Sequence, residues 1–215
     1  MTFFRHAALI LATAVALSAA PLTLDLGQGL AYHRAHALPA DLPAAAPARR
    51  QPLVLDLRYA TGDADAATAL SAWLKFRAAP RTPVFLLANS ATSPALRAAL
   101  ADRERTAGLI VLGLAGPGFD PDIALKTTAA AERLAYDALT DARSLAGLIN
   151  PPVEKPRNDE ARLVADHRVG RTPEPAAADA TSAPATPPPT PTSATDAVLQ
   201  RAVHLHRTLL ALKKL

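Results

Sequence analysis

The sequence predicts an α/β fold: a small, mostly parallel β-α-β-α-β-α core, with a proline-rich linker and a carboxyl-terminal amphipathic helix. Two observations carry this prediction. Short apolar runs alternate with helix-like segments between residues 53 and 148, and strands that alternate with helices form parallel sheets with right-handed crossovers. The second apolar run, Val84 to Ala88, contains no polar residue, which is typical of an interior strand covered on both faces.

The individual elements follow from local signals. The first strand is expected over residues 53–59, and Asp63 or Asp65 then caps a helix over residues 64–78. The helix after the second strand begins near Ser93, with Pro94 in its first turn, where a missing N–H has no helical partner to lose. The remaining predicted elements are a strand at 109–112, a glycine-rich turn at 113–118, an extended piece at 120–125 and a helix at 128–148.

The amino-terminal residues predict export. Residues 1–20 have the layout of a secretory signal peptide: Arg5 and His6, an apolar run from Ala7 to Leu17, and small residues after it. The run is shorter than the roughly 20 apolar residues that span a bilayer. We therefore expect a periplasmic or secreted protein, with an uncleaved anchor as the alternative. Residues 21–51 are predicted to be a linker, because several prolines interrupt regular structure there.

The carboxyl-terminal part predicts a tether and a helix. The α/β domain is expected to occupy residues 52–170, with a short helix near its end. Residues 171–195 are rich in Pro, Ala and Thr and predict a disordered linker. Residues 196–215 have an apolar stripe typical of an amphipathic helix. We expect this helix to dock on its own domain or to mediate self-association. Export also makes contact with the cell envelope an expectation, but the few cations on the polar face of the helix disfavour membrane-surface binding.

Composition excludes several classes of function. The net charge is +4, yet the basic residues form no cluster interleaved with aromatic side chains, so no nucleic-acid partner is predicted. The absence of Cys removes disulfides and cysteine-based zinc or redox sites. His204 and His206 stand two residues apart, on different faces of a helix, and are predicted to be surface residues. Gly113, Gly116 and Gly118 do not match a phosphate-binding spacing. We predict no metal and no cofactor.

Two serines are the candidates for chemistry. Ser90 and Ser93 stand in the turn between the second strand and the following helix. A serine nucleophile needs a base to take its proton and backbone N–H groups to hold an oxyanion. Gly62, at the end of the first strand, is the candidate N–H donor. The bases that the folded core offers are Lys75, Lys126 and, at its margin, His167. The sequence pattern places none of them beside the serines, and Lys126 is kept as the candidate base. The alternative interpretation is that both serines are turn and cap residues.

Three segments, in this order, resemble the carboxy-terminal-processing (tail-specific) serine proteases. Leu53 to Asp63 resembles the family's Leu-Asp-Leu-Arg strand and the glycine pair of its oxyanion hole, with Gly62 at the first glycine. Pro83 to Leu100 is similar to its apolar strand, serine loop and Ala-Leu-rich helix, and Gly118 to Ile123 to its Gly-Ile-x-Pro-Asp-Ile segment. The tail from Asp196 to Val203 is also similar. The resemblance implies a ClpP/crotonase-like fold.

The departures from this family concern its catalytic residues. An ungapped alignment puts Ala91 at the nucleophile position and Ser93 on a neighbouring loop serine, and residues 112–121 contain no lysine where the family has its general base. We therefore expect an exported, catalytically inactive relative that acts as a binding or structural module for a peptide or protein partner. The alternative is an active serine endopeptidase that uses Ser90 or Ser93, with Lys126 displaced into the site.

Overall fold

The computed structural model describes residues 20–44, 51–101, 106–150, 168 and 195–215. The chain divides into two compact units. We call Met1–Lys126 together with Ala202–Leu215 the sheet unit, and Thr127–Arg201 the helical unit. This division differs from the predicted domain at residues 52–170, because the sheet unit ends at Lys126 and includes the end of the chain.

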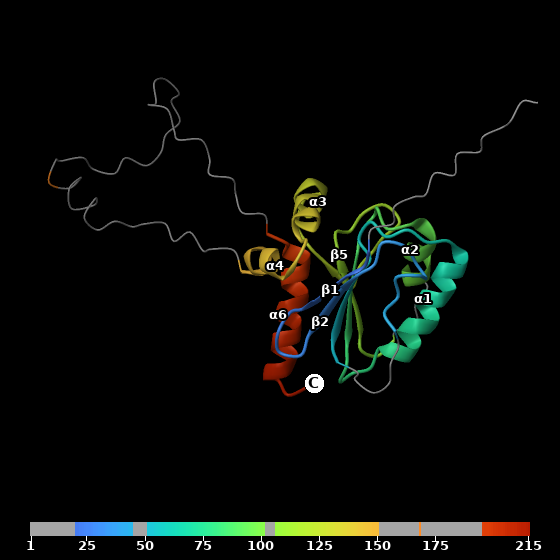
Figure 1. The fold of residues 1–215 in the computed structure, drawn as a ribbon, viewed down its shortest axis with the longest axis horizontal. Coiled ribbons are helices and arrows are strands. Elements are labelled where there is room, and N and C mark those ends of the chain that lie inside the picture. Colours follow the sequence, from blue (N-terminus) through green and yellow to red (C-terminus); the bar gives the residue numbers. More distant parts are fainter. Residues whose placement is uncertain (1–19, 45–50, 102–105, 151–167, 169–194) are drawn as a thin grey trace, which may run out of the picture. The chain divides into compact units, whose positions relative to one another are not determined.

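A six-stranded sheet forms the centre of the sheet unit (Figure 1). Its strands have the same order in space as in the chain: β1 (Leu22–Asp25), β2 (Ala31–Arg34), β3 (Leu53–Asp56), β4 (Val84–Ala88), β5 (Leu109–Gly113) and β6 (Ile123–Ala124). β1 is antiparallel to β2, and every later strand is parallel to the one before it. The predicted α/β class with a mostly parallel sheet is therefore confirmed.

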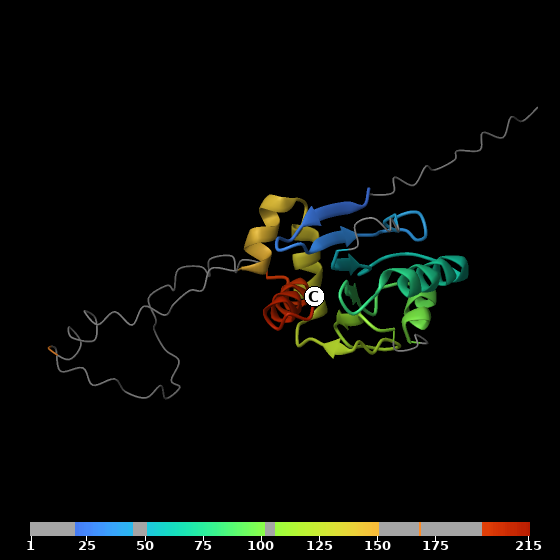
Figure 2. The same cartoon turned by 90° about the horizontal axis from the view of Figure 1, so that it is seen from below.

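Two helices connect the central strands and lie on the same side of the sheet. α1 (Ala64–Arg77) joins β3 to β4, and α2 (Pro94–Ala101) joins β4 to β5. Right-handed crossovers that advance in one direction along a sheet place their helices on one face, as Figures 1 and 2 show for this pair. Asp63 caps α1, as predicted, because its carboxylate accepts the Ala66 N–H at 2.9 Å.

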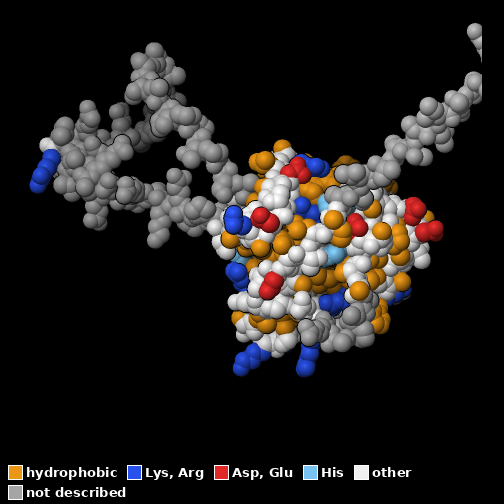
Figure 3. Space-filling model, in the orientation of Figure 1, with side chains coloured by type: hydrophobic (Ala, Val, Ile, Leu, Met, Phe, Trp, Pro, Cys, Tyr) orange, Lys and Arg blue, Asp and Glu red, His pale blue; other side chains and the backbone are white. Residues whose placement is uncertain are grey.

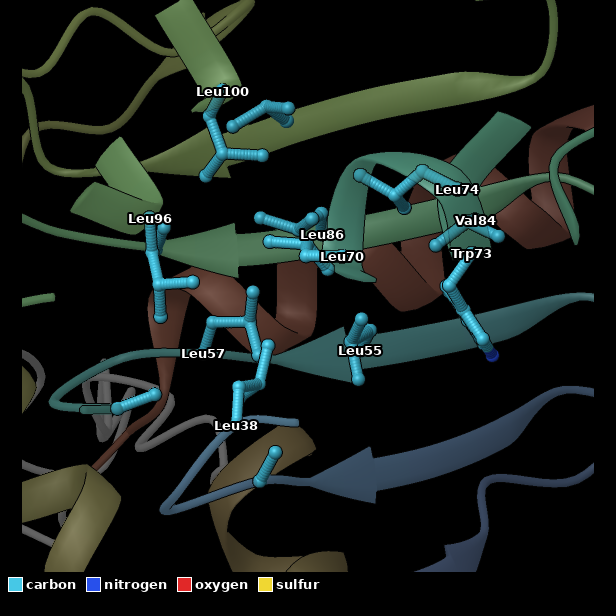
Figure 4. Close-up of a cluster of buried hydrophobic side chains, with 14 of the residues drawn as sticks. Leu38, Leu55, Leu57, Leu70, Trp73, Leu74, Val84, Leu86, Leu96 and Leu100 are labelled. Carbon is cyan, nitrogen blue, oxygen red and sulfur yellow. The ribbon is translucent and has the colours of Figure 1, made fainter. Parts of the chain in front are cut away.

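The main hydrophobic core lies between these helices and the sheet (Figure 4). Leu55 and Leu86 face it from neighbouring strands, Leu70 from α1 and Leu96 from α2. All five residues of β4 are buried, in agreement with the apolar run that predicted an interior strand. Each fully buried leucine contributes about 1.5–3 kcal/mol, so this cluster holds the loops that follow the strands in place.

The other face of the sheet carries residues 202–211 of the terminal helix, α6 (Ala197–Ala211). Phe85 points to the face opposite Leu86, since successive side chains of a strand alternate. Its ring meets the His206 imidazole edge-on, with 6.5 Å between ring centroids and 88° between planes. The prediction that His206 is a surface residue is wrong, because it is only 1% exposed. Helical periodicity places His206 on one face of the helix, but it does not show that the sheet covers this face.

The prediction that residues 21–51 form a linker is wrong at its amino-terminal end. β1 and β2 form a hairpin around residues 27–29, all three of which have positive φ angles. β2 then extends the sheet by pairing with β3, from Ala31 opposite Leu53 to Arg34 opposite Asp56. Strands of four residues leave little periodicity in the sequence, and they are stabilised by cross-strand pairing with a distant segment.

The helical unit replaces the predicted helix at 128–148 with two shorter helices, α3 (Ala129–Ala138) and α4 (Ala142–Ile149). The break occurs at Asp141, whose carboxylate accepts the N–H groups of Arg143 and Ser144 while the Ser144 hydroxyl accepts the Asp141 N–H. This capping box starts a new helix. The hydrogen bonds from backbone to the Asp141 carboxylate, that of Ser144 first, also lower the pKa of this acid.

Several predictions lie wholly or almost wholly outside the described residues. These are the signal peptide at 1–20, the short helix within 157–170 and the disordered linker at 171–195. The predicted terminal helix at 196–215 is present as α6, which ends at Ala211. Among the helices of the described ranges, none has the length and apolar character needed to traverse a lipid bilayer.

Candidate functional site

Three loops meet at the carboxyl ends of the parallel strands. They follow β3 (residues 57–63), β4 (residues 89–93) and β5 (residues 114–122). Ligands of open α/β sheets bind outside the carboxyl ends of the strands, so this edge is the candidate site. It brings together Gly62, Ser90 and Ser93, three of the four residues predicted from the sequence.

Side chains of the β4–α2 loop fix its conformation. The Asn89 side-chain oxygen accepts the N–H groups of Ala91 and Thr92, at 3.0 and 3.1 Å. The Thr92 hydroxyl donates to the Leu57 carbonyl at 2.9 Å and accepts the Asn89 N–H at 3.1 Å. Asn89 and Thr92 are both buried, so the loop is a rigid turn attached to the neighbouring strand.

Ser93 is committed to a structural hydrogen bond. Its hydroxyl donates to the Gly62 carbonyl at 2.8 Å, and its N–H donates to the Ala60 carbonyl at 2.9 Å. A hydroxyl has a single proton to donate, and a nucleophilic serine must direct that proton to a base. A carbonyl oxygen cannot accept it as a base. Ser93 therefore joins two loops and directly precedes α2.

Ser90 is exposed at the same edge and lies against the next loop. A β-carbon placed on Gly116 would lie 3.4 Å from the Ser90 Cβ and 3.7 Å from its Oγ. Within the described ranges, the Ser90 hydroxyl forms no hydrogen bond. Ala91, at the nucleophile position of the family alignment, is exposed beside it. The loop thus presents a hydroxyl and a methyl group to solvent.

Lys126 is not joined to either serine. Ala88, Gly113 and Ala124 are aligned across β4, β5 and β6, and two strand spacings separate the outer two by about 10 Å. Lys126 follows Ala124 by two residues and is exposed. In the part of the chain that the structure describes, its amine forms no hydrogen bond or salt bridge. The Lys126 amine therefore forms no hydrogen bond with Ser90 or Ser93 in this structure.

Gly62 is a glycine because of packing. A β-carbon there would lie 2.9 Å from the Ala66 Cβ and 3.2 Å from the Leu96 side chain. The Thr61 carbonyl accepts the Leu38 N–H at 2.9 Å. Because the C=O and N–H of a trans peptide point in opposite directions, the Gly62 N–H is directed away from Leu38.

Arg97 is a site residue that sequence reasoning missed. Its guanidinium donates to the Thr92 carbonyl at 2.9 Å, and also to the carbonyls of Pro117 and Gly118, at 2.9 and 3.1 Å. One side chain of α2 thus holds the loop after β4 against the loop after β5. An arginine in the first turn of a helix gives no local signal of such a role, since two of its three acceptors lie on a loop about 20 residues further along the chain.

A buried charged network, which the sequence did not predict, joins side chains of β2 to side chains at the end of β3. The Arg58 guanidinium donates to the Asp56 carboxylate at 2.7 Å, and both side chains are fully buried. The Tyr32 hydroxyl donates to the same carboxylate at 2.7 Å, and Arg34 Nε donates to that hydroxyl at 3.1 Å. The available signal was the Leu-Asp-Leu-Arg run, because Asp56 and Arg58 stand two residues apart on one face of an extended segment.

This network sets the ionisation of its members. Burial alone would raise the pKa of Asp56, but the attraction of Arg58 and its hydrogen bonds outweigh burial and hold that pKa below its usual value. Burial, and then repulsion by the Asp56 carboxylate, raise the pKa of Tyr32 well above its usual value. The pair is thus a charged anchor at the carboxyl end of β3. Without exposed surface it cannot exchange protons with a substrate.

An open groove of about 1140 Å³ lies beside the loop after β5. It is lined by Ala101, Thr106, Ala107, Leu109, Ile110, Gly116, Gly118, Phe119, Asp120, Pro121 and Asp122. β6 covers only Leu112 and Gly113 of β5, and the Asp122 carboxylate accepts the Val111 N–H at 2.8 Å. The edge of β5 at residues 109–111 therefore borders the groove without a neighbouring strand.

No protein-family profile, curated protein or solved structure matches this chain. In the described ranges, no three His, Asp or Glu side chains gather as metal ligands would. The candidate site therefore rests on its own geometry: a rigid hydroxyl-bearing turn, a backbone N–H at Gly62 and an adjoining groove.

Proposed function

We propose that this chain is an exported, catalytically inactive relative of the tail-specific serine proteases, with the corresponding ClpP/crotonase-like fold, and that it binds extended polypeptide without cleaving it. The observation that carries the proposal is the 2.8 Å hydrogen bond from the Ser93 hydroxyl to the Gly62 carbonyl. It engages the proton that a nucleophile must give to a base. The hydroxyl of Ser90, the second serine, forms no hydrogen bond to a base in the described ranges. Since neither serine hydroxyl is bonded to a base, the turn is proposed to bind a polypeptide without hydrolysing it.

The groove supports the choice of an extended polypeptide as partner. An exposed strand edge binds a peptide by adding it as a further strand, through main-chain hydrogen bonds. The edge of β5 at residues 109–111 is not paired with β6, and Leu109 and Ile110 line the groove. The N–H groups of Leu109 and Val111 on this edge donate to the Thr106 carbonyl and the Asp122 carboxylate, so an added chain must displace these two bonds. Arg97 ties the loop that borders this groove to the serine turn, so the two features form one surface.

A binding and cleavage experiment tests this function. Fluorescently labelled, reduced casein serves as the extended polypeptide, with anisotropy for binding and gel electrophoresis for cleavage. We expect binding without cleavage. Ala107→Trp fills the groove from an exposed position and is expected to weaken binding at least tenfold, whereas Ala72→Trp, exposed on α1, leaves it unchanged.

Two results would overturn the proposal. Cleavage that Ser90→Ala or Ser93→Ala abolishes would establish the alternative, an active endopeptidase, and Lys126→Gln would then test its base. Failure to bind casein, or equal binding by both tryptophan variants, would refute the polypeptide site. Export is tested separately by amino-terminal sequencing of the protein from a periplasmic fraction; an intact Met1 in the cytoplasm would contradict it.

A further inference from the structure

The carboxyl-terminal end of α6 combines exposed leucines with basic side chains. Leu210 and Leu212 are 37% and 62% exposed, whereas Ala202 and Val203, two turns earlier, are 0% and 2% exposed. Arg207, Lys213 and Lys214, which lie within a few residues of these leucines in the chain, are also exposed. We call Arg207, Leu210, Leu212, Lys213 and Lys214 the terminal patch.

The terminal patch carries positive charge, and the helix that bears it has no acidic side chain. Residues 197–215 contain no Asp or Glu. Asp196, just before them, is buried, and its carboxylate accepts the Leu199 N–H at 3.0 Å. Within the described ranges, none of the three patch cations forms a salt bridge. Figure 3 shows basic side chains projecting from the lower end of the molecule, where Figure 1 marks the carboxyl terminus.

The backbone holds the terminal patch in one conformation. Lys213 has a φ of 53°, and its N–H donates to the Leu210 carbonyl at 2.9 Å, while the Lys214 N–H donates to the Leu209 carbonyl at 2.9 Å. This pair of bonds is the Schellman ending of a helix. Both lysines therefore follow the exposed leucines in the ordered ending of the helix. The helix itself is fixed to the sheet one turn earlier, through His206 against Phe85.

We propose that the terminal patch binds the surface of an anionic lipid bilayer. Leu210 and Leu212 enter the acyl region, and Arg207, Lys213 and Lys214 meet the lipid phosphates. An anionic membrane surface offers apolar contact and negative charge side by side, which matches this patch in both respects. The helix has few cations in total, but three of them stand between residues 207 and 214 next to the exposed leucines. This proposal is independent of the groove and of any activity.

The absence of Cys from the chain allows a local probe. In the full chain, Ala211→Cys is labelled with an environment-sensitive fluorophore, and Lys75→Cys on α1 provides the control label. Both proteins are mixed with phosphatidylcholine vesicles, with and without phosphatidylglycerol. We expect a blue shift at position 211 with the anionic vesicles alone, and none at position 75. A local label separates this contact from any binding by the apolar run at residues 7–17, which is common to both proteins.

Matched variants separate the contribution of the basic side chains from that of the leucines. Each basic residue near an anionic surface contributes a factor of about five, so Lys213→Gln with Lys214→Gln is expected to raise the lipid concentration at half response roughly 30-fold. The control, Lys75→Gln with Arg81→Gln, removes the same number of charges from exposed positions elsewhere. It is expected to leave the lipid concentration at half response unchanged. Leu210→Ser with Leu212→Ser is expected to abolish the blue shift.

Three results would overturn the proposal. The first is an equal shift with neutral vesicles, or no shift at all. The second is an equal loss of response in both glutamine pairs, which would indicate overall charge rather than this patch. The third is a concentration-dependent dimer, seen by light scattering, that the two serine substitutions dissociate; the patch would then be a contact between two copies of the chain.

Discussion

The Ser93 hydroxyl donates a hydrogen bond to the Gly62 carbonyl, 2.8 Å away, and so joins the loop after β4 to the loop after β3. The N–H of Ser93 adds a second bond to the Ala60 carbonyl, and Thr92 a third to the Leu57 carbonyl. The polar residues of this turn thus satisfy backbone groups of the neighbouring loop. Their role is to hold the edge of the sheet in one geometry.

Ser93→Ala is therefore expected to lower stability and not to remove an activity. It deletes one half-buried hydrogen bond, which is worth about 1 kcal/mol. Ser90→Ala is the matched control, because Ser90 is exposed and its change should stay within about 0.5 kcal/mol. Urea denaturation followed by circular dichroism measures both. Equal losses in the two variants would contradict the assignment of Ser93 as the joint between the loops.

The Asp56–Arg58 pair is expected to dominate the stability of the carboxyl edge. Asp56→Asn removes the charge that Arg58 and Tyr32 bind in a fully buried position, and breaking a buried ion pair costs about 3–5 kcal/mol. The exposed pair Arg133–Asp137, also at 2.7 Å, provides the comparison. Asp137→Asn should change stability by less than about 1 kcal/mol. Similar denaturation midpoints for both variants would refute a structural role of the buried pair.

Docking of α6 is expected to weaken in mild acid through His206. Burial, and then the charge of Arg207, lower the pKa of His206 below its usual value of 6.5. The unfolded chain therefore binds this proton more readily than the folded chain. The stability contributed by neutral His206 is complete above pH 6.5 and is lost as the pH falls below that value, towards the lowered pKa of the folded state.

Urea midpoints on both sides of this pH measure the effect. We expect His206→Leu to flatten the pH dependence, and His204→Leu, at an exposed position of the same helix, to leave it as in the original chain. If both variants kept the full dependence, another group would be responsible for it.

The candidate site was predictable only in its position. Ser90, Ser93 and Gly62 were placed together at one edge because parallel strands bring their carboxyl ends to the same side of a sheet. Their partners were not predictable. The Gly62 carbonyl that engages Ser93 lies 31 residues away in the chain, and the carbonyl acceptors of Arg97 lie up to 21 residues away. Such bonds depend on how two loops are set against each other.

The sequence by itself determined the alternation from β3 to β5, because an all-apolar strand, a helix cap and a proline at a helix start act within a few residues of each other. Tertiary structure alone decided that β1 and β2 join the sheet, since four-residue strands are stable only when paired with a distant partner. It also decided that His206 is buried while Leu212 is exposed on the same terminal segment. Helical periodicity defines a face, but the element packed against that face determines which of its residues lose contact with water.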